Sequence, residues 1–193
     1  MSTNKTHLFI LIGPAGAGKT TLAKAIAAKK ELNLKLIPSY TTRQPRPEEQ
    51  NGIDYNFITQ ADFDKKLAAG FFIESSTAYK NSYGSGRNDV LEPLKKGYVV
   101  LVVLDRVGAR AVLKELPDAI IINIVPPNLE ILRERLLKRN KDFTQDVEFR
   151  LKKAEEELAE EQHEKLAKHA IVNDDLEASL ENLFDIVGRE SRS

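Results

Sequence analysis

The chain has 193 residues, of which 41% are apolar and 30% charged, values typical of one globular domain with a buried core. Its 29 basic and 29 acidic residues cancel, so no overall field favours nucleic acid or an anionic membrane as a partner. The absence of cysteine excludes disulfides, thiolate metal sites and a cysteine nucleophile. No stretch approaches the roughly 20 apolar residues that cross a bilayer, and we expect a cytoplasmic protein.

A strand, a helix and a second strand are expected first in the chain. Leu8–Ile12 is an apolar run that ends at a glycine, as in a buried strand. The alanine-rich segment Thr20–Lys30 has helical periodicity, and Leu34–Ile37 suits a short strand. The composition changes between Pro38 and Gly86, where we expect an inserted lobe with one short helix, Ala61–Ala69.

Strands and helices alternate in the second half. Tyr98–Leu104 and Ala119–Val125 are β-branched runs that suit strands covered on both faces, and Val107–Leu116 between them suits a helix. The remaining expected elements are helices at Asn128–Arg139, Asp146–Lys168 and Leu176–Val187 and a short strand at Ala170–Val172. On the long helix, the i,i+4 pairs Glu161/Lys165 and Glu164/Lys168 are typical of a solvated face. The pattern predicts a three-layer α/β fold with a mainly parallel central sheet.

A phosphate-binding signature follows the first strand. Residues 13–20, GPAGAGKT, match GxxxxGK[ST], with a strand predicted before them and a helix after them. Glycines let the backbone curl so that its N–H groups face phosphate oxygens, and the helix N-terminus adds positive potential. Lys19 is expected to bridge the β- and γ-phosphates of ATP, and the Thr20 hydroxyl to bind Mg²⁺. The predicted ATP-binding residues are Gly13, Ala15, Gly16, Ala17, Gly18, Lys19, Thr20 and Thr21.

The phosphate loop leaves the acceptor open, because motors, GTPases and small-molecule kinases share it. Downstream, Arg43 and Arg46 stand three residues apart around a proline, and their planar guanidinium groups suit bidentate phosphate contacts. The hydroxyl of Tyr55 could reach the same phosphate. Glu74 follows three apolar residues, which would partly desolvate its carboxylate. Each feature alone is common surface chemistry, and their order behind the phosphate loop is what favours an acceptor site.

Taken together, these segments resemble the guanylate kinase family. The matching segments are GPAGAGKTT at 13–21, SYTTRQPR at 39–46, NGIDYNFI at 51–58, FIE at 72–74, YGS at 83–85, Asp105, GAR at 108–110, VPP at 125–127, ERLLKR at 134–139 and VNDDLE at 172–177. They keep the family's order and spacing from about Leu8 to Val187. TTRxPR combined with DYxF is more specific than the phosphate loop. The resemblance implies a P-loop kinase fold.

Roles for the acceptor-side residues follow from the resemblance, position by position. The acceptor phosphate would be held by Ser39, Arg43, Arg46, Tyr55 and Tyr83. Glu74 and Ser85 match the residues that read guanine, and Asp105 matches an acidic residue near the guanine and the metal-bound phosphates. A carboxylate can accept from N1–H and the exocyclic amine of guanine, whereas adenine presents an unprotonated N1. Glu74 therefore favours GMP as the acceptor.

Three further arginines match the family's lid: Arg135, Arg139 and Arg150. Phosphoryl transfer mainly needs positive charge around the moving group, so the expected catalytic residues are Lys19, Arg43, Arg135, Arg139 and Arg150. The implied organisation is a P-loop core at residues 5–38, 87–136 and 151–190. An acceptor-binding lobe would occupy 39–86 and a small lid 137–150.

Several positions depart from the family pattern. Val103 stands where the family has a second acidic residue, and Val107 where it has Gln. The other departures are Arg106 at an apolar position, Ser75 for Trp, Ser82 for the first Tyr of a Tyr-Tyr-Gly run, and Asn140-Lys141 for Gly-Thr. They cluster near the acceptor and the metal, so reduced turnover and a shifted acceptor both stay open.

The leading hypothesis is a monomeric or homodimeric phosphotransferase that uses ATP and Mg²⁺ to convert GMP, with dGMP as a second acceptor, to the diphosphate. One alternative is a kinase for another small phosphorylated acceptor. A second alternative is a non-catalytic guanylate-kinase-like binding module, in which the phosphate loop is typically degraded; here the loop is intact.

Overall fold

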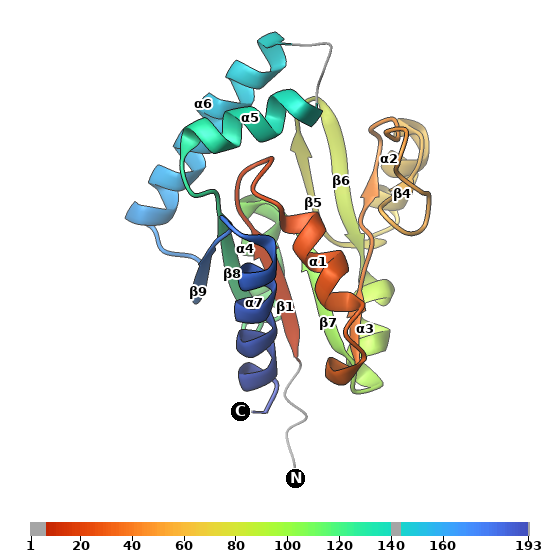
Figure 1. Cartoon of the computed structure of the whole chain (residues 1–193). Helices are drawn as coiled ribbons and strands as arrows, with labels where there is room; N and C mark the ends of the chain where they lie inside the picture. Colours follow the sequence, from red (N-terminus) through yellow and green to blue (C-terminus); the bar gives the residue numbers. More distant parts are fainter. Residues whose placement is uncertain (1–6, 140–143, 193) are drawn as a thin grey trace.

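Five parallel strands form the central sheet of the computed structural model, which describes residues 7–139 and 144–192 (Figure 1). In spatial order they are β2 (Leu34–Leu36), β7 (Val99–Val103), β1 (Leu8–Ile12), β8 (Ile120–Val125) and β9 (His169–Val172). Every neighbouring pair is parallel. The carboxyl ends of the strands therefore meet at one edge, where ligands bind in open α/β sheets.

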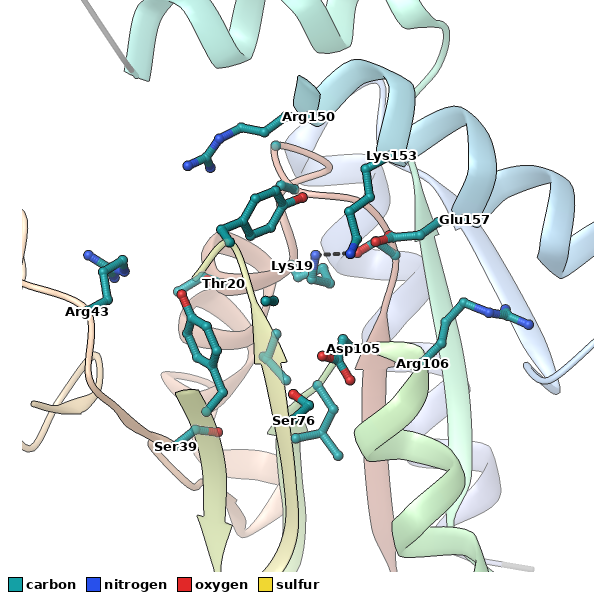
Figure 2. Close-up of a pocket in the computed structure, with 18 of the residues that line it drawn as sticks. Lys19, Thr20, Ser39, Arg43, Ser76, Asp105, Arg106, Arg150, Lys153 and Glu157 are labelled. Carbon is teal, nitrogen blue, oxygen red and sulfur yellow. Dashed lines mark hydrogen bonds between the residues drawn. The ribbon is translucent and has the colours of Figure 1, made fainter. Parts of the chain in front are cut away.

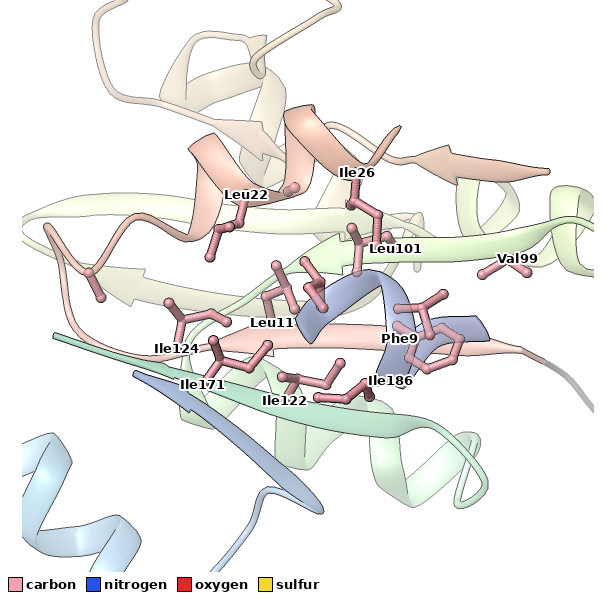
Figure 3. Close-up of a cluster of buried hydrophobic side chains, with 14 residues drawn as sticks. Phe9, Leu11, Leu22, Ile26, Val99, Leu101, Ile122, Ile124, Ile171 and Ile186 are labelled. Atoms are coloured by element: carbon pink, nitrogen blue, oxygen red, sulfur yellow. The ribbon is translucent and has the colours of Figure 1, made fainter. Parts of the chain in front are cut away.

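Helices cover both faces of this sheet. On one face, Phe9 and Leu11 of β1 pack in a cluster with side chains of α1 (Lys19–Ala27) and α7 (Leu176–Glu190), shown in Figure 3. On the other face, Ile10 packs in a cluster that includes α3 (Arg87–Lys95) and α4 (Arg106–Glu115). Because β1 is buried from both sides, both of its side-chain rows are apolar. The predicted three-layer α/β fold is confirmed.

A second, smaller sheet is built from residues 40–86. Its spatial order is β4 (Asn56–Phe57), β3 (Tyr40–Thr41), β6 (Asn81–Gly86) and β5 (Phe72–Ala78), and α2 (Gln60–Ala68) accompanies it. Thr59 caps α2 by accepting a hydrogen bond from the backbone N–H of Asp62. The helix is close to the predicted one. The strands were not predicted, because they are short, polar and paired between distant segments.

Two further helices, α5 (Leu129–Arg139) and α6 (Thr144–His163), pack on each other above the carboxyl edge of the central sheet (Figure 1). Their shared cluster consists of the buried Leu132, Leu136, Val147 and Ala154. A short 3-10 turn, Lys30–Leu32, separates α1 from β2. Within residues 7–139 and 144–192, no helix has the length and apolar character required to cross a membrane.

The predicted helix Asp146–Lys168 is wrong at its C-terminal end, because α6 stops at His163. The carboxylate of Glu161 accepts hydrogen bonds from the backbone N–H groups of Leu166 (3.1 Å) and Ala167 (2.9 Å), which turns the chain toward β9. The expected i,i+4 pairing of Glu161 with Lys165 is likewise wrong. Glu161 instead pairs with Arg106 at the start of α4.

Helix α3 was not predicted. It contains Pro93 in its last turn, and its hydrophobic residues are too few to give a clear helical period. Val90 and Leu94 are nevertheless buried against the central sheet. Tertiary burial, which sequence periodicity does not report, thus accounts for this helix.

The guanidinium of Arg106 joins the start of α4 to the end of α6. Its side chain is 6% exposed, and it pairs with the Glu161 carboxylate, while Nη2 donates to the carbonyl of Glu164 at 3.0 Å. Glu160 approaches Nε at 3.3 Å. A buried guanidinium tolerates loss of its carboxylate partner poorly, because the remaining charge stays desolvated.

We expect Glu161→Gln to lower the free energy of unfolding by about 3 kcal/mol, near the low end for breaking a buried ion pair, because Glu160 stays nearby. The matched control is Glu164→Gln, which removes the exposed partner of Arg110 at the same helix end and should change stability by less than about 1 kcal/mol. Urea unfolding of both variants measures the difference. Equal losses would contradict the structural role assigned to Arg106.

Candidate active site

The phosphate loop lies between β1 and α1, and two of its glycines occupy positions where a side chain would not fit. Gly13 has a φ of +128°, and a Cβ atom there would lie 2.1 Å from the carbonyl oxygen of Ile124 in β8. Gly18 has a φ of +97°, and a Cβ there would lie 2.1 Å from Nδ2 of Asn173. That amide donates to the carbonyl of Ala17 at 2.7 Å. The ends of β8 and β9, which lie on the same side of β1, therefore brace the loop.

The N-terminus of α1 is open toward the loop. Gly18 is its N-cap residue and supplies no side-chain cap. A helix start of this kind presents backbone N–H groups and the positive end of the helix dipole to an anion. Nζ of Lys19 donates to the carbonyls of Gly13 and of Pro14 (2.9 Å), so its ammonium group lies over the loop. The arrangement is that of a phosphate-binding loop.

One cavity of about 320 Å³ extends from this loop to the second sheet and to α6 (Figure 2). Its walls include the loop residues Gly13, Ala15, Gly16, Gly18, Lys19, Thr20 and Thr21. They also include the predicted acceptor residues Ser39, Arg43, Arg46, Tyr55, Glu74, Tyr83 and Asp105. Residues predicted for two different substrates thus line a single space.

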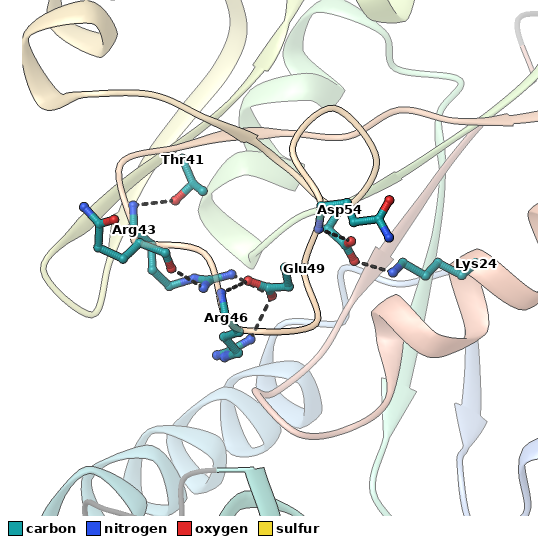
Figure 4. A network of polar contacts seen from close by, with 8 residues as sticks. Lys24, Thr41, Arg43, Arg46, Glu49 and Asp54 are labelled. Carbon is teal, nitrogen blue, oxygen red and sulfur yellow. Dashed lines mark hydrogen bonds and ion pairs between the residues drawn. The ribbon is translucent and has the colours of Figure 1, made fainter.

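Figure 4 shows how the two acceptor-side arginines are held. The buried carboxylate of Glu49 lies between them, 2.9 Å from Nη2 of Arg43 and 3.2 Å from Nη1 of Arg46. It also accepts a hydrogen bond from the backbone N–H of Arg46 at 2.8 Å. Burial opposes its ionisation, yet these contacts lower the pKa of Glu49. Glu49 therefore keeps two cations side by side at the cavity, a positioning that the sequence analysis did not identify.

The carboxyl group of Glu74 lies deep in the second sheet. Its residue is 5% exposed, and it pairs across the β5–β6 ladder with Ser85, which is 1% exposed. Burial raises the pKa of Glu74 to about 7, with a further rise from Asp105, while hydrogen bonding from Ser85 opposes the shift. The hydroxyl groups of Ser39 and Ser85 are 3.3 Å apart. When ionised, a carboxyl group in this position can accept hydrogen bonds from two neighbouring donors of a bound ligand.

The start of α4 closes the cavity near Glu74. Asp105 is the N-cap of that helix, and its Oδ1 accepts from the backbone N–H of Gly108 at 2.7 Å. A Cβ atom at Gly108 would lie 2.5 Å from Oε2 of Glu74, so a side chain there would displace this carboxyl group. Asp105 therefore both caps the helix and faces the cavity.

Helix α6 contributes more residues than the sequence analysis predicted. Arg150 lines the cavity as expected, and Lys153 and Glu157, three and seven positions later on the same helix, line it too. Figure 2 shows both side chains directed toward Lys19. Burial raises the pKa of Glu157, and Lys19 and Lys153 oppose the rise. The i, i+3, i+7 spacing from Arg150 was the signal that could have identified them.

Among the predicted site residues whose side chains the structure describes, Arg135, Ala17 and Ser85 do not line the cavity. Arg135 donates from Nη2 to the carbonyl of Asp174 at 3.4 Å, and its buried Nη1 makes no hydrogen bond within the described part of the chain. Arg139 lies on α5, but its side chain is outside the described residues. Ala17 packs in the core, and Ser85 lies behind Ser39.

Some of the residues that depart from the family pattern line the cavity, and others make contacts elsewhere. Val103 and Val107 both line it, and Val107 is 62% exposed. Arg106 also lines the cavity, but its guanidinium group is directed away from it and pairs with Glu161. Ser82 donates to the side chain of Gln60 at 3.3 Å and takes part in the ladder of the second sheet. Asn140 and Lys141 lie outside the described residues.

The donor groups that face the cavity fit Mg²⁺. The hydroxyl of Thr20 and the carboxylates of Asp105 and Glu157 supply the oxygen ligands that Mg²⁺ prefers. No cluster of three or more His, Asp or Glu residues among residues 7–139 and 144–192 could hold a metal ion alone. Mg²⁺ of this kind is bound by few protein groups together with substrate phosphates and water.

The fold and the cavity agree with what comparisons with known proteins show. The family model described as guanylate kinase matches residues 5–190. A guanylate kinase of Coxiella burnetii is 42% identical over 187 residues, 97% of this chain and 89% of that protein. One of Rickettsia bellii is 37% identical over 192 residues, covering 100% of this chain and 98% of the relative.

Among solved structures, the guanylate kinase of Anaplasma phagocytophilum superimposes with a TM-score of 0.79 at 27% identity. The match covers 96% of this chain and 86% of that one. Family model, relatives and structure agree over nearly the whole length. The chain belongs to the guanylate kinase family.

Proposed function

We propose that the protein transfers the γ-phosphoryl group of ATP to GMP, giving ADP and GDP. The observation that carries the proposal is that a single cavity is lined by a phosphate loop, two arginines held side by side and a buried carboxyl group. Guanylate kinase relatives spanning the whole chain support the same reaction. dGMP is a second acceptor, because none of the groups assigned to guanine or phosphate requires the 2′-hydroxyl.

The acceptor side selects and orients GMP. Arg43 and Arg46 bind its phosphate, with the hydroxyls of Ser39, Tyr55 and Tyr83 as further donors. In its ionised form, Glu74 accepts hydrogen bonds from N1–H and the exocyclic amine of guanine. Ser85 supports the carboxylate from the neighbouring strand. AMP would leave this buried carboxylate facing an unprotonated nitrogen, which costs about 1–3 kcal/mol or more.

The donor side holds ATP and stabilises the charge of the moving phosphoryl group. Backbone N–H groups of residues 15–21 and Nζ of Lys19 contact the β- and γ-phosphates. Arg150 approaches from α6, and Arg135 and Arg139 on α5 are assigned to the same reaction, Arg139 as part of the proposed lid at 137–150 and Arg135 next to it. Thr20 would hold Mg²⁺, which would neutralise phosphate charge when bound.

This division of labour corresponds to three proposed parts of the chain. The core comprises residues 5–38, 87–136 and 151–190, and the acceptor-binding lobe comprises 39–86, which includes the second sheet. Water is kept from the phosphoryl group when lobe and lid cover both substrates. Whether the enzyme is a monomer or a homodimer stays a prediction, as does its cytoplasmic location.

A panel of acceptors tests the function. We expect ATP-dependent release of ADP with GMP and dGMP and much less with AMP, CMP or UMP, measured in a coupled assay. Turnover of a different phosphorylated acceptor would support the alternative kinase. ATP binding without turnover of any acceptor would support a non-catalytic module and contradict the proposal.

Replacement of the loop lysine tests the donor side. Lys19→Ala should lower kcat by about 10²-fold or more, the loss seen when one donor to the transition state is removed. Lys29→Ala, which removes an exposed lysine after α1, is the control and should leave kcat unchanged. A near-normal rate for Lys19→Ala would contradict the role of this ammonium group.

The raised pKa of Glu74 predicts pH-dependent binding of GMP. Since recognition requires the carboxylate and its pKa is about 7, the dissociation constant for GMP should rise about tenfold between pH 8 and pH 6. Glu74→Gln provides the control, because it keeps the titration of the GMP phosphate while losing that of residue 74. Parallel pH profiles for the two proteins, measured by calorimetry, would rule out this titration.

The raised pKa of Glu74 also predicts that the free energy of unfolding falls as pH rises, over the range in which GMP binding improves. The folded-state pKa of about 7 lies above the ordinary 4.5, so ionisation of Glu74 opposes folding as pH rises through this window. Glu74→Gln should therefore gain about 2 kcal/mol of unfolding free energy relative to wild type between pH 5 and pH 8. Denaturant titrations at the two pH values measure this gain, and an unchanged difference would contradict it.

A further inference from the structure

The turn between β5 and β6 reaches helix α6. This hairpin tip, residues 78–81, carries Tyr79, whose half-buried ring meets Phe149 edge-on with centroids 6.0 Å apart. The guanidinium carbon of Arg150 lies 4.7 Å from the centre of the same ring, and Nζ of Lys153 lies 5.6 Å from it. One aromatic side chain thus contacts three residues on the second and third turns of α6.

The backbone of the tip is unfavourable for the residues it holds. Tyr79 and Lys80 have φ values of +51° and +64°, both in the left-handed region, between the paired residues Ala78 and Asn81. Such two-residue turns strongly favour Asn-Gly. A tyrosine in this conformation is strained, and strain of this kind persists where surrounding contacts compensate it. The contacts of the ring with α6 are among them, together with a hydrogen bond from Nδ2 of Asn81 to the carbonyl of Tyr79 at 2.8 Å.

The ring also lies where two like charges approach each other. Arg150, Lys153 and Tyr79 all line the cavity. An aromatic face attracts a cation through its quadrupole, so one ring can hold both side chains near the cavity despite their mutual repulsion. Phe149, which is 57% exposed, shields the edge of the ring.

The hairpin that ends in Tyr79 also carries acceptor groups. Glu74 on β5 faces Ser85 on β6, Ser76 faces Tyr83, and the ladder continues without a break in register to the tip. A change in the position of the acceptor lobe therefore carries the ring with it. The contact with α6 connects the groups assigned to GMP with cations on the donor side.

We propose that Tyr79 is a positioning residue that ties the acceptor lobe to helix α6 and holds Arg150 and Lys153 at the cavity, so that GMP binding and the placement of these cations are coupled. The proposal rests on the proposed function for its catalytic consequence. The ring provides the link, and the hydroxyl group is not required for it.

Two substitutions separate the ring from the turn. Tyr79→Asn removes the ring but suits the left-handed conformation, so the hairpin should fold at least as well as in wild type. Tyr79→Phe keeps the ring. We expect Tyr79→Asn to lower kcat about tenfold, within the range that loss of cation–π contacts allows, and Tyr79→Phe to stay within about twofold of wild type.

The coupling between GMP binding and ATP-analogue binding is a measurement that a purely structural role of Tyr79 would leave unchanged. In wild type, GMP should bind more tightly in the presence of a non-hydrolysable ATP analogue than in its absence, and calorimetry measures that ratio. Tyr79→Asn should bring the ratio toward one, while Tyr79→Phe should preserve it. The same ratio and kcat in Tyr79→Asn and wild type would overturn the proposal.

The neighbouring residue supplies the matched control. Lys80 is exposed and shares the turn, so Lys80→Asn alters turn strain without touching the ring. It should leave kcat and the binding ratio unchanged. If Lys80→Asn reproduced the defects of Tyr79→Asn, turn geometry would be responsible and the role of the ring would be refuted.

Hydrogen exchange in the free protein distinguishes failure of this proposal from failure of the proposed function. Amides of the hairpin tip and of residues 147–153 should exchange faster in Tyr79→Asn than in wild type or Tyr79→Phe, with no substrate present. Unchanged exchange would overturn the link itself. Faster exchange in a protein inactive toward GMP would support the link and contradict only the assigned reaction.

Discussion

The curled backbone of residues 13–18 is the constraint on which the rest of the structure depends. Its N–H groups can stabilise phosphate charge effectively only if they need not reorganise when the charge arrives. Gly13 lies against the carbonyl of Ile124, and Gly18 against the amide of Asn173, so neither position accommodates a side chain. The buried strand β1 and the helix α1 fix the two ends of this loop, and the ends of β8 and β9 pack against it.

Cations that converge on one cavity repel one another, and partly buried carboxylates offset that repulsion. Glu49 lies between Arg43 and Arg46, and Glu157 shares its surroundings with Lys19 and Lys153. These carboxylates keep the positive groups in place without themselves being assigned to a substrate. Positive groups held in this way need little rearrangement to contact phosphate, which is the condition for electrostatic catalysis.

The hairpin β5–β6 combines recognition with connection between parts of the molecule. Burial that raises the pKa of Glu74 makes the carboxylate costly to the folded state, but the same burial makes an unmatched base costly to bind. Selectivity is therefore obtained at the expense of stability. At the other end of the hairpin, Tyr79 adopts a strained backbone conformation next to α6. The two ends of one ladder thus hold a buried carboxyl group and a strained tyrosine, neither of which is favourable for stability by itself.

Local signals were enough to determine the chain's central elements and its chemistry. An apolar run before GxxxxGK[ST] predicted β1, the loop and α1, and motif order placed Arg43, Arg46 and Glu74 behind it. Tertiary structure decided what depends on residues far apart in the chain. Helix α3 forms against the sheet although it contains Pro93. Helix α6 ends after Glu161, because the carboxylate of Glu161 accepts hydrogen bonds from the backbone of Leu166 and Ala167 and also pairs with Arg106. Lys153, Glu157 and Tyr79 reach the cavity, whereas Arg135 turns to Asp174, because packing between α5, α6 and the hairpin sets these directions.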